Sequence, residues 1–508
     1  MMFSITVYSI LTIPILYFIL NELRGLYKLL KYKLQGVKYV KYLPTPYTIY
    51  LDATSLSSND CYETQKKGSK DFDRKEPFRM MNLSSNCILT LLSDEAIREY
   101  FKKELDVSIK QKNLKSVEFL GFFFQNGKEM MERRALFAKI FHYSNVVNMM
   151  PEIKNVIREH VRRLKKSVMS TGGTRKVDLK KEFSEGLFED LTGCMLFKGA
   201  SNKITDQFEG MSVTKILKKM FNSFYSAPTN PVNYIPYAEA LGLNKEANEI
   251  RRLKKGLIEI IRKKYNKRYN KQELDDTSVL DIMIKLNKES EKETGKAKFT
   301  MEEICSNFEV FQFAASDTSF QLSCTTLVFL ALQENKIYQK RVKDEINSKF
   351  LNEENYSNDA LNSLKQLDLV FKEAARMANP APQNAFRVVS KEFELCGYKI
   401  YKDDVIRVLL LGYSPQFFSE PFKFNPDRFD ENHPNFKKIP KMSHIPFSHG
   451  QRGCLGKYLG EMMVKLLVVE LIKEFEVSVD PGYKMKFKLN PLYGVDNPDL
   501  ILSVRNSS

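Results

Sequence analysis

The 508-residue chain contains no tryptophan and only five histidines. The histidines form no His-x-x-x-His pair, which argues against a histidine metal site. The seven cysteines are an odd number, and no two of them lie within five residues of each other. This spacing argues against a zinc ribbon and against a disulfide framework, and it is typical of a reducing compartment.

The chain also lacks an arginine-rich tract and any recognisable nucleic-acid module, although its formal net charge is +17 and its pI about 9.2. Most of the excess is lysine, spread along the sequence, so we interpret it as a solvated surface and expect no nucleic-acid partner. Hydrophobic residues make up 43% of the chain, enough for a substantial core.

Charge is absent from residues 3–20 at the N-terminus. These eighteen mostly apolar residues are just long enough to span a bilayer, and basic residues follow them. We predict a transmembrane anchor at residues 1–22, a basic linker with a proline joint (Leu43–Pro46) at residues 23–46, and a body at 47–508 on the cytosolic side. A cleaved signal peptide is the alternative, but no basic residue precedes the apolar run and no small-x-small site follows it.

Three glycines surround Cys454 in the stretch Phe447–Gly456, and an amphipathic helical pattern follows. The positive end of a helix and nearby N–H groups favour a thiolate over a thiol. Phe447 is placed to pack against a large flat group, and Arg452 to neutralise an anion. An anionic porphyrin bound through iron needs these three features. The alternative is a buried structural cysteine in a glycine-rich turn.

A second segment begins at Thr300 and Glu303, which form a capping-box pattern. The pattern predicts a long helix that is apolar on nearly all sides and therefore buried. Asp317 and Thr318 lie in its middle, where an acid and an alcohol are costly unless paired or used. The alternative is a threonine bonded back to a carbonyl one turn earlier and an acid in a salt bridge.

The pattern Phe-x-x-Gly-x-Arg-x-Cys-x-Gly resembles the haem-binding loop of the cytochrome P450 family. The helix around Asp317 and Thr318 resembles that family's central helix, Ala-Gly-x-Asp-Thr-Thr. Two positions depart from it, because Ala315 replaces glycine and Ser319 replaces the second threonine.

Four other segments match the family in order along the chain. The pair Glu373 and Arg376 resembles its Glu-x-x-Arg helix, whose partner would be Arg428 in Pro-Asp-Arg-Phe. Arg134 and Arg387 match arginines that bind haem propionates. Met130 stands where the family has a tryptophan, so a second propionate donor is missing there.

The resemblance implies a mainly α fold with small β-sheets, forming a single large haem domain. It implies heme b (iron protoporphyrin IX) as the cofactor, with Cys454 as the iron ligand. It assigns propionate binding to Arg134, Arg387 and Arg452, and a wall of the haem site to Phe447.

The resemblance further implies that Asp317 and Thr318 relay protons in a monooxygenase that inserts one atom of O2 into an apolar substrate. We find no Gly-x-Gly-x-x-Gly fingerprint and no length for a flavin domain. Electrons would therefore come from NADPH–cytochrome P450 reductase, with cytochrome b5 as an optional second partner, at the endoplasmic reticulum membrane.

Two other functions stay open. One is a haem-thiolate isomerase or dehydratase acting on lipid hydroperoxides, which needs neither dioxygen nor a reductase; the Asp317–Thr318 pair argues against it. The other is a haem-binding sensor or carrier without turnover.

Overall fold

The computed structural model describes residues 2–37, 40–41, 77–83, 86–110, 121–197, 207–226, 242, 244–270, 274, 278–350, 356–382, 387–408, 410, 417–489 and 492–505. The predicted proline joint at Leu43–Pro46 lies outside these residues. Most of the described chain is helical and the strands form small sheets, which confirms the predicted mainly α fold class.

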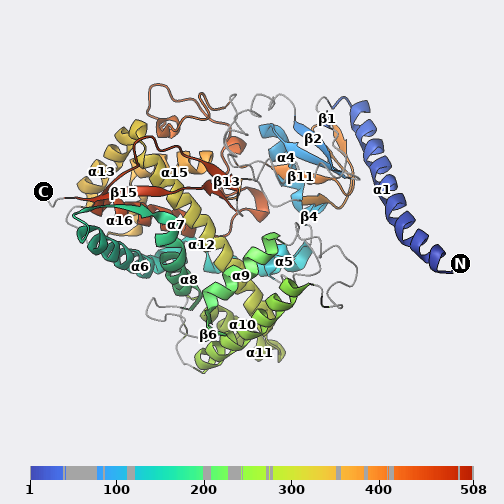
Figure 1. The fold of residues 1–508 in the computed structure, drawn as a ribbon, viewed down its shortest axis with the longest axis horizontal. Coiled ribbons are helices and arrows are strands. Elements are labelled where there is room, and N and C mark those ends of the chain that lie inside the picture. Colours follow the sequence, from blue (N-terminus) through green and yellow to red (C-terminus); the bar gives the residue numbers. More distant parts are fainter. Residues whose placement is uncertain are drawn as a thin grey trace.

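The helices run through the whole chain (Figure 1). Their bounds are α1 (Met2–Leu34), α4 (Asp94–Val107), α5 (Gly127–Ile140), α6 (Tyr143–Met169), α7 (Leu179–Glu182), α8 (Phe188–Phe197), α9 (Val213–Ser226), α10 (Lys245–Tyr269), α11 (Val279–Thr294), α12 (Met301–Ala331), α13 (Lys336–Phe350), α14 (Asn358–Asn362), α15 (Lys365–Met377) and α16 (Lys457–Glu474).

The largest sheet has the strand order β1-β2-β3-β11-β8-β4 and lies between α1 and the body of helices (Figure 1). Its strands are β1 (Val40–Lys41), β2 (Phe78–Leu83), β3 (Asn86–Leu91), β11 (Val405–Val408), β8 (Arg387–Val389) and β4 (Ser108–Lys110).

The remaining sheets are smaller, and one of them joins the C-terminus to the middle of the chain. They consist of β12 (Phe475–Ser478), β15 (Asp499–Val504) and β5 (Thr174–Asp178); β9 (Phe393–Leu395) and β10 (Tyr398–Ile400); β13 (Phe487–Leu489) and β14 (Tyr493–Val495); and β6 (Gln207–Phe208) and β7 (Met211–Ser212).

Helix α12 crosses the body of the protein and forms the centre of the larger apolar core (Figure 1). The Thr300 hydroxyl accepts from the Glu303 N–H at 3.2 Å, and the Glu303 carboxylate accepts from the Thr300 N–H at 2.8 Å. This confirms the predicted capping box. Helix α12 packs closely against α16, which follows the cysteine loop. The two segments that carry predicted chemistry are thus neighbours.

Helix α1 continues without a break to Leu34, and its C-terminal half packs on the large sheet. Tyr32 and Asp404 are fully buried there. The Asp404 carboxylate accepts from the Tyr32 hydroxyl at 2.6 Å, from Lys28 Nζ at 2.8 Å and from the Cys87 N–H at 3.1 Å. A buried carboxylate with three donors fixes α1 to the sheet.

Within α1, the side chains of residues 2–15, 17 and 18 lie outside the described part of the chain. Among the residues that the structure does describe, no helix is both long enough and apolar enough to cross a membrane.

We expect Tyr32→Phe to lower the free energy of unfolding by about 1–2 kcal/mol, because the substitution removes one hydrogen bond to a buried carboxylate. Urea denaturation measures this. Tyr27→Phe is the matched control, because Tyr27 lies on the same helix and is 59% exposed. Equal effects of the two substitutions would contradict the assigned role of Asp404.

Candidate functional site

The cysteine loop begins with a short 3-10 turn, Gly450–Arg452, and ends where α16 starts at Lys457. The Cys454 N–H donates to the Phe447 carbonyl at 2.8 Å, which closes the loop on itself. Gly450 has a φ of 75°, a left-handed conformation that favours glycine, and a side chain there would also press on Phe101. Cys454 is therefore held by backbone geometry rather than by side-chain packing.

The environment of Cys454 differs from the expectation that the helix end favours its thiolate. Burial among surrounding groups raises the pKa of the Cys454 thiol above its usual value, and the Gly456 N–H and Arg134 oppose this only in part. Yet the side chain keeps accessible surface. Cys454 thus keeps some accessible surface although many groups surround its sulfur. Desolvation by these groups affects the pKa of the thiol more than the helix terminus does.

Phe447 lies beside the same loop and stacks on Phe371 of α15, with ring centroids 6.4 Å apart and an interplanar angle of 16°. Gly460 in α16 lies close to both Phe447 and Ser319 of α12. A Cβ atom added at Gly460 would be 3.8 Å from the Phe447 ring and 3.8 Å from the Ser319 hydroxyl. The cysteine loop, α15 and the middle of α12 therefore meet at one place.

Asp317 and Thr318 lie in the middle of α12. The Thr318 hydroxyl donates to the Ala314 carbonyl one turn earlier at 2.6 Å, the local bond weighed above as the alternative to a chemical role. Burial raises the pKa of the Asp317 carboxyl, and Lys218 on α9 opposes this shift. Asp317 consequently holds its proton to a higher pH than an exposed aspartate.

The three predicted propionate-binding arginines come from different elements and lie around the cysteine loop. Arg134 on α5 donates to the Gly453 carbonyl. Arg452 donates one N–H to the Asn126 side chain at 3.2 Å, while its Nε and Nη1 are buried and have no hydrogen-bond partner. Arg387 on β8 donates to Glu104 at 2.7 Å.

The structure adds a fourth cation that the sequence did not indicate. Lys110 ends β4 and is only 8% exposed. Burial, Arg387 and Arg452 lower the pKa of its ammonium group well below the usual value, and Glu104 opposes them. We call Lys110, Arg134, Arg387 and Arg452 the cationic cluster.

The cationic cluster fits the predicted haem. Buried guanidinium groups are costly without an anion, and Nε and Nη1 of Arg452, the two nitrogens without a partner, are donors in an arrangement that suits a carboxylate. A free thiol lies next to them, because Arg134 interacts electrostatically with Cys454. A ligand with two carboxylates on one edge and a thiolate-binding metal at its centre satisfies both features. The assignment of Phe447 and the three arginines to haem binding stays a prediction.

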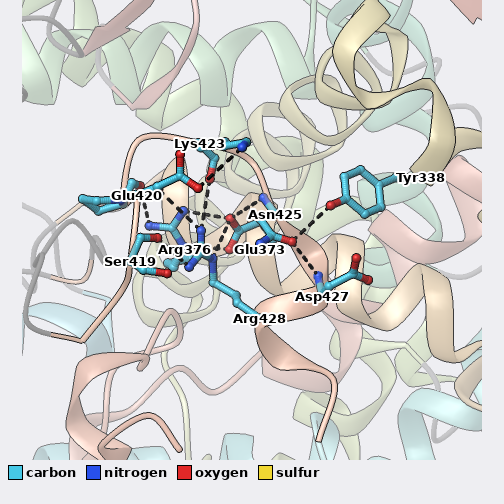
Figure 2. A network of polar contacts seen from close by, with 10 residues as sticks. Tyr338, Glu373, Arg376, Ser419, Glu420, Lys423, Asn425, Asp427 and Arg428 are labelled. Carbon is cyan, nitrogen blue, oxygen red and sulfur yellow. Dashed lines mark hydrogen bonds and ion pairs between the residues drawn. The ribbon is translucent and has the colours of Figure 1, made fainter. Parts of the chain in front are cut away.

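Glu373 on α15 lies at the centre of a second polar network (Figure 2). Its carboxylate accepts from Arg376 at 2.7 and 2.8 Å, from Arg428 at 3.1 Å and from the Asn425 N–H at 2.8 Å. Glu373 and Arg376 are fully buried. The predicted bond between Glu373 and Arg428 is thus confirmed, and Arg376 joins Arg428 through their shared partner Glu373.

This network is joined to the cysteine loop. Asn379, just after α15, donates to the Pro446 carbonyl at 2.7 Å, next to Phe447. The α15 helix therefore supports the loop both by this bond and by the Phe371 ring.

Glu309 is a further buried acid on α12, two turns before Asp317. It is 4% exposed, and its Oε1 has no hydrogen-bond partner. Burial raises the pKa of Glu309 from 4.5 to about 7, and Lys254 on α10 opposes this.

Comparison with known proteins gives a consistent result. A family model described as cytochrome P450 matches residues 46–502. The chain is 26% identical over 326 residues to a sterol 14alpha-demethylase of Mycolicibacterium vanbaalenii. It is 33% identical over 207 residues to cytochrome P450 3A27 of Oncorhynchus mykiss. It is 23% identical over 403 residues to cytochrome P450 72A15 of Arabidopsis thaliana. These alignments cover 62%, 39% and 78% of this chain.

The same alignments span 66% of the demethylase, 39% of cytochrome P450 3A27 and 75% of cytochrome P450 72A15. Two solved structures share the fold. Retinoic acid-bound cyanobacterial CYP120A1 has a TM-score of 0.73 at 17% identity, covering 92% of this chain and 99% of its own. The cytochrome P450DA heme domain has a TM-score of 0.73 at 14% identity, covering 92% of this chain and 98% of its own. The predicted cytochrome P450 fold is confirmed.

We expect Glu373→Gln to destabilise the protein by about 3–5 kcal/mol, because it leaves two buried guanidinium groups without their counter-charge. The midpoint of chemical denaturation measures this. Glu420→Gln is the control, because Glu420 pairs with Lys423 where both side chains are more than 60% exposed. A shift no larger than the control's would contradict a structural role for Glu373.

We expect Glu309→Gln to stabilise the protein by about 3 kcal/mol at pH 8 and to have little effect near pH 5. Between pH 4.5 and about 7 the folded protein keeps the Glu309 proton that the unfolded chain has lost. Its contribution to stability is therefore full below pH 4.5 and is lost as the pH rises to about 7. Urea midpoints at the two pH values measure the difference.

Glu302→Gln is the control for this pH dependence, because Glu302 is exposed on the first turn of the same helix. If both variants showed the same change between pH 5 and pH 8, Glu309 would not be the buried titrating acid.

Proposed function

We propose, from the premise that the chain belongs to the cytochrome P450 family, that it is a haem-thiolate monooxygenase that inserts one atom of O2 into an apolar organic substrate. The observation that carries the proposal is the juxtaposition of Cys454 with the cationic cluster. A thiol alone fits a structural cysteine. A thiol beside four buried or half-buried cations, with two guanidinium nitrogens lacking partners, fits a metal-bound group that carries carboxylates.

In this proposal, iron protoporphyrin IX (heme b) is ligated by Cys454 and supplies the oxidising chemistry. Arg134, Arg387 and Arg452 hold its propionates. The loop geometry fixes the sulfur, because the Cys454 N–H is already bonded to the Phe447 carbonyl. Phe447, stacked on Phe371, would form an apolar wall of the haem site.

Asp317 and Thr318 would handle protons on α12. The Asp317 carboxyl has a raised pKa because it is buried, so it is a proton donor closer to neutral pH. The Thr318 hydroxyl donates its hydrogen bond to the Ala314 carbonyl. Its oxygen lone pairs therefore stay free to accept a hydrogen bond from a bound species. This division supports a donor role for Asp317 and an orienting role for Thr318.

The electron donor in this proposal is a separate NADPH–cytochrome P450 reductase, with cytochrome b5 as a second partner. Lys441 and Lys457 are exposed on either side of the cysteine loop and support docking of an acidic protein. Arg452 does not belong to that surface. Its Nε and Nη1 atoms are buried.

We also propose that α1 attaches the protein to the endoplasmic reticulum membrane as a single-pass anchor with the haem domain in the cytosol. From Leu16 to Leu34, α1 exposes one apolar stripe at helical spacing. It comprises Leu16, Ile19, Leu20, Leu23, Leu26, Tyr27, Leu30 and Leu34. Such a stripe continues an apolar surface toward the folded body and suits lipid contact.

We expect the reduced protein with carbon monoxide to show a strongly red-shifted Soret band, and Cys454→Ala to lose that band, because only a thiolate ligand produces the shift. An absorption spectrum measures this. Cys396→Ala is the control, because Cys396 is partly exposed in the sheet region. A folded wild-type protein that takes up no haem would overturn the proposed function.

A further inference from the structure

The Glu104 carboxylate lies among the cations of the cationic cluster, and the proposed function assigns this residue no role. Glu104 lies on α4 and is 1% exposed. Its Oε1 accepts from Arg387 Nε at 2.7 Å, while its Oε2 is buried and has no hydrogen-bond partner. A buried carboxylate oxygen that lacks a donor is costly, so its retention requires a reason.

The neighbours of Glu104 show where that charge acts. Glu104 interacts electrostatically with Lys110, Arg134 and Arg452 as well as with its partner Arg387. It is therefore close to every member of the cationic cluster. At full protonation the cluster carries four positive charges against this single negative one.

The strand register explains why the positive charges cannot separate. Lys110 and Arg387 are directly opposite each other on the antiparallel pair β4 and β8. Like charges that face each other across two strands repel, and both of these side chains are buried. Glu104 is the carboxylate that lies among them, and the Cys454 thiol and the Tyr100 hydroxyl are the other acidic groups that act on the cluster.

We propose that Glu104 is a positioning residue that acts as a resident anion of the cationic cluster, holding Arg387 in place and setting how much positive charge faces the haem propionates. This rests on the proposed haem site. Glu104 does not touch the cofactor in this proposal. It determines the electrostatic potential at the haem edge through Arg387.

A consequence follows for the haem iron. Reduction adds an electron, so additional positive charge nearby favours the ferrous form. Glu104→Gln keeps the shape and an oxygen acceptor for Arg387 but removes the negative charge. We expect it to raise the ferrous-to-ferric ratio at a fixed potential roughly three- to tenfold, which is about 30–60 mV for one electron.

Spectroelectrochemical titration of the full-length holoprotein measures the reduction potential. The matched control is Asp404→Asn. Asp404 is another fully buried carboxylate in the same apolar core, and its partners are Lys28 and Tyr32. A raised potential in Glu104→Gln and an unchanged one in Asp404→Asn support the proposal. A Glu104→Gln potential equal to that of the wild type, with a normal carbon monoxide band, would overturn it.

The double variant Lys110→Gln/Glu104→Gln separates charge from packing. It removes one cation together with the anion. We therefore expect the ferrous-to-ferric ratio of the double variant, at a fixed potential, to lie within about twofold of the wild-type ratio. If Glu104→Gln alone does not accumulate with haem, recovery of haem in the double variant supports the proposal, and failure to recover overturns it. A wild-type protein without the thiolate band would instead defeat the proposed function.

Discussion

Excess positive charge beneath the surface is the constraint on which the site depends. The cationic cluster brings three guanidinium groups and one ammonium group together beside Cys454, and Glu104 compensates only one of the charges. Burying unmatched charge costs free energy that the apolar core has to offset. A ligand that carries anions to this place would recover that cost on binding. Under the proposed function, cofactor binding and folding are therefore coupled.

The network around Glu373 is balanced in the opposite way. Its carboxylate accepts four hydrogen bonds, two of them from Arg376, and no anionic ligand is needed to complete it. A satisfied buried network rigidifies the segment it holds. Asn379 and Phe371 join this rigid network to the cysteine loop. The protein thus has a fully paired ion network that supports the loop and an incompletely paired one beside Cys454.

Much of this arrangement was predictable where chemistry and local pattern coincide. The capping box at Thr300, the buried central helix and the pairing of Glu373 with Arg428 each have a signal within a few residues or a family motif. Glu104, Lys110 and Asn126 had none. Lys110 begins a polar stretch with Lys112 and Lys115, which indicates a solvated surface. Its burial arises because β4 pairs with β8, nearly 280 residues later, and a single sequence does not contain that pairing.

The pKa of Cys454 shows a second limit. The helix start after the loop is where the pattern placed it, but the direction of the pKa shift depends on how much chain surrounds the sulfur. Local sequence specifies the dipole and the N–H groups, whereas desolvation is a property of the whole fold. The same distinction applies to the β4–β8 edge. Two like charges opposite each other destabilise a sheet, so Lys110 and Arg387 oppose folding at this edge. Under the proposed function the bound haem would compensate this cost, which local rules of strand stability do not include.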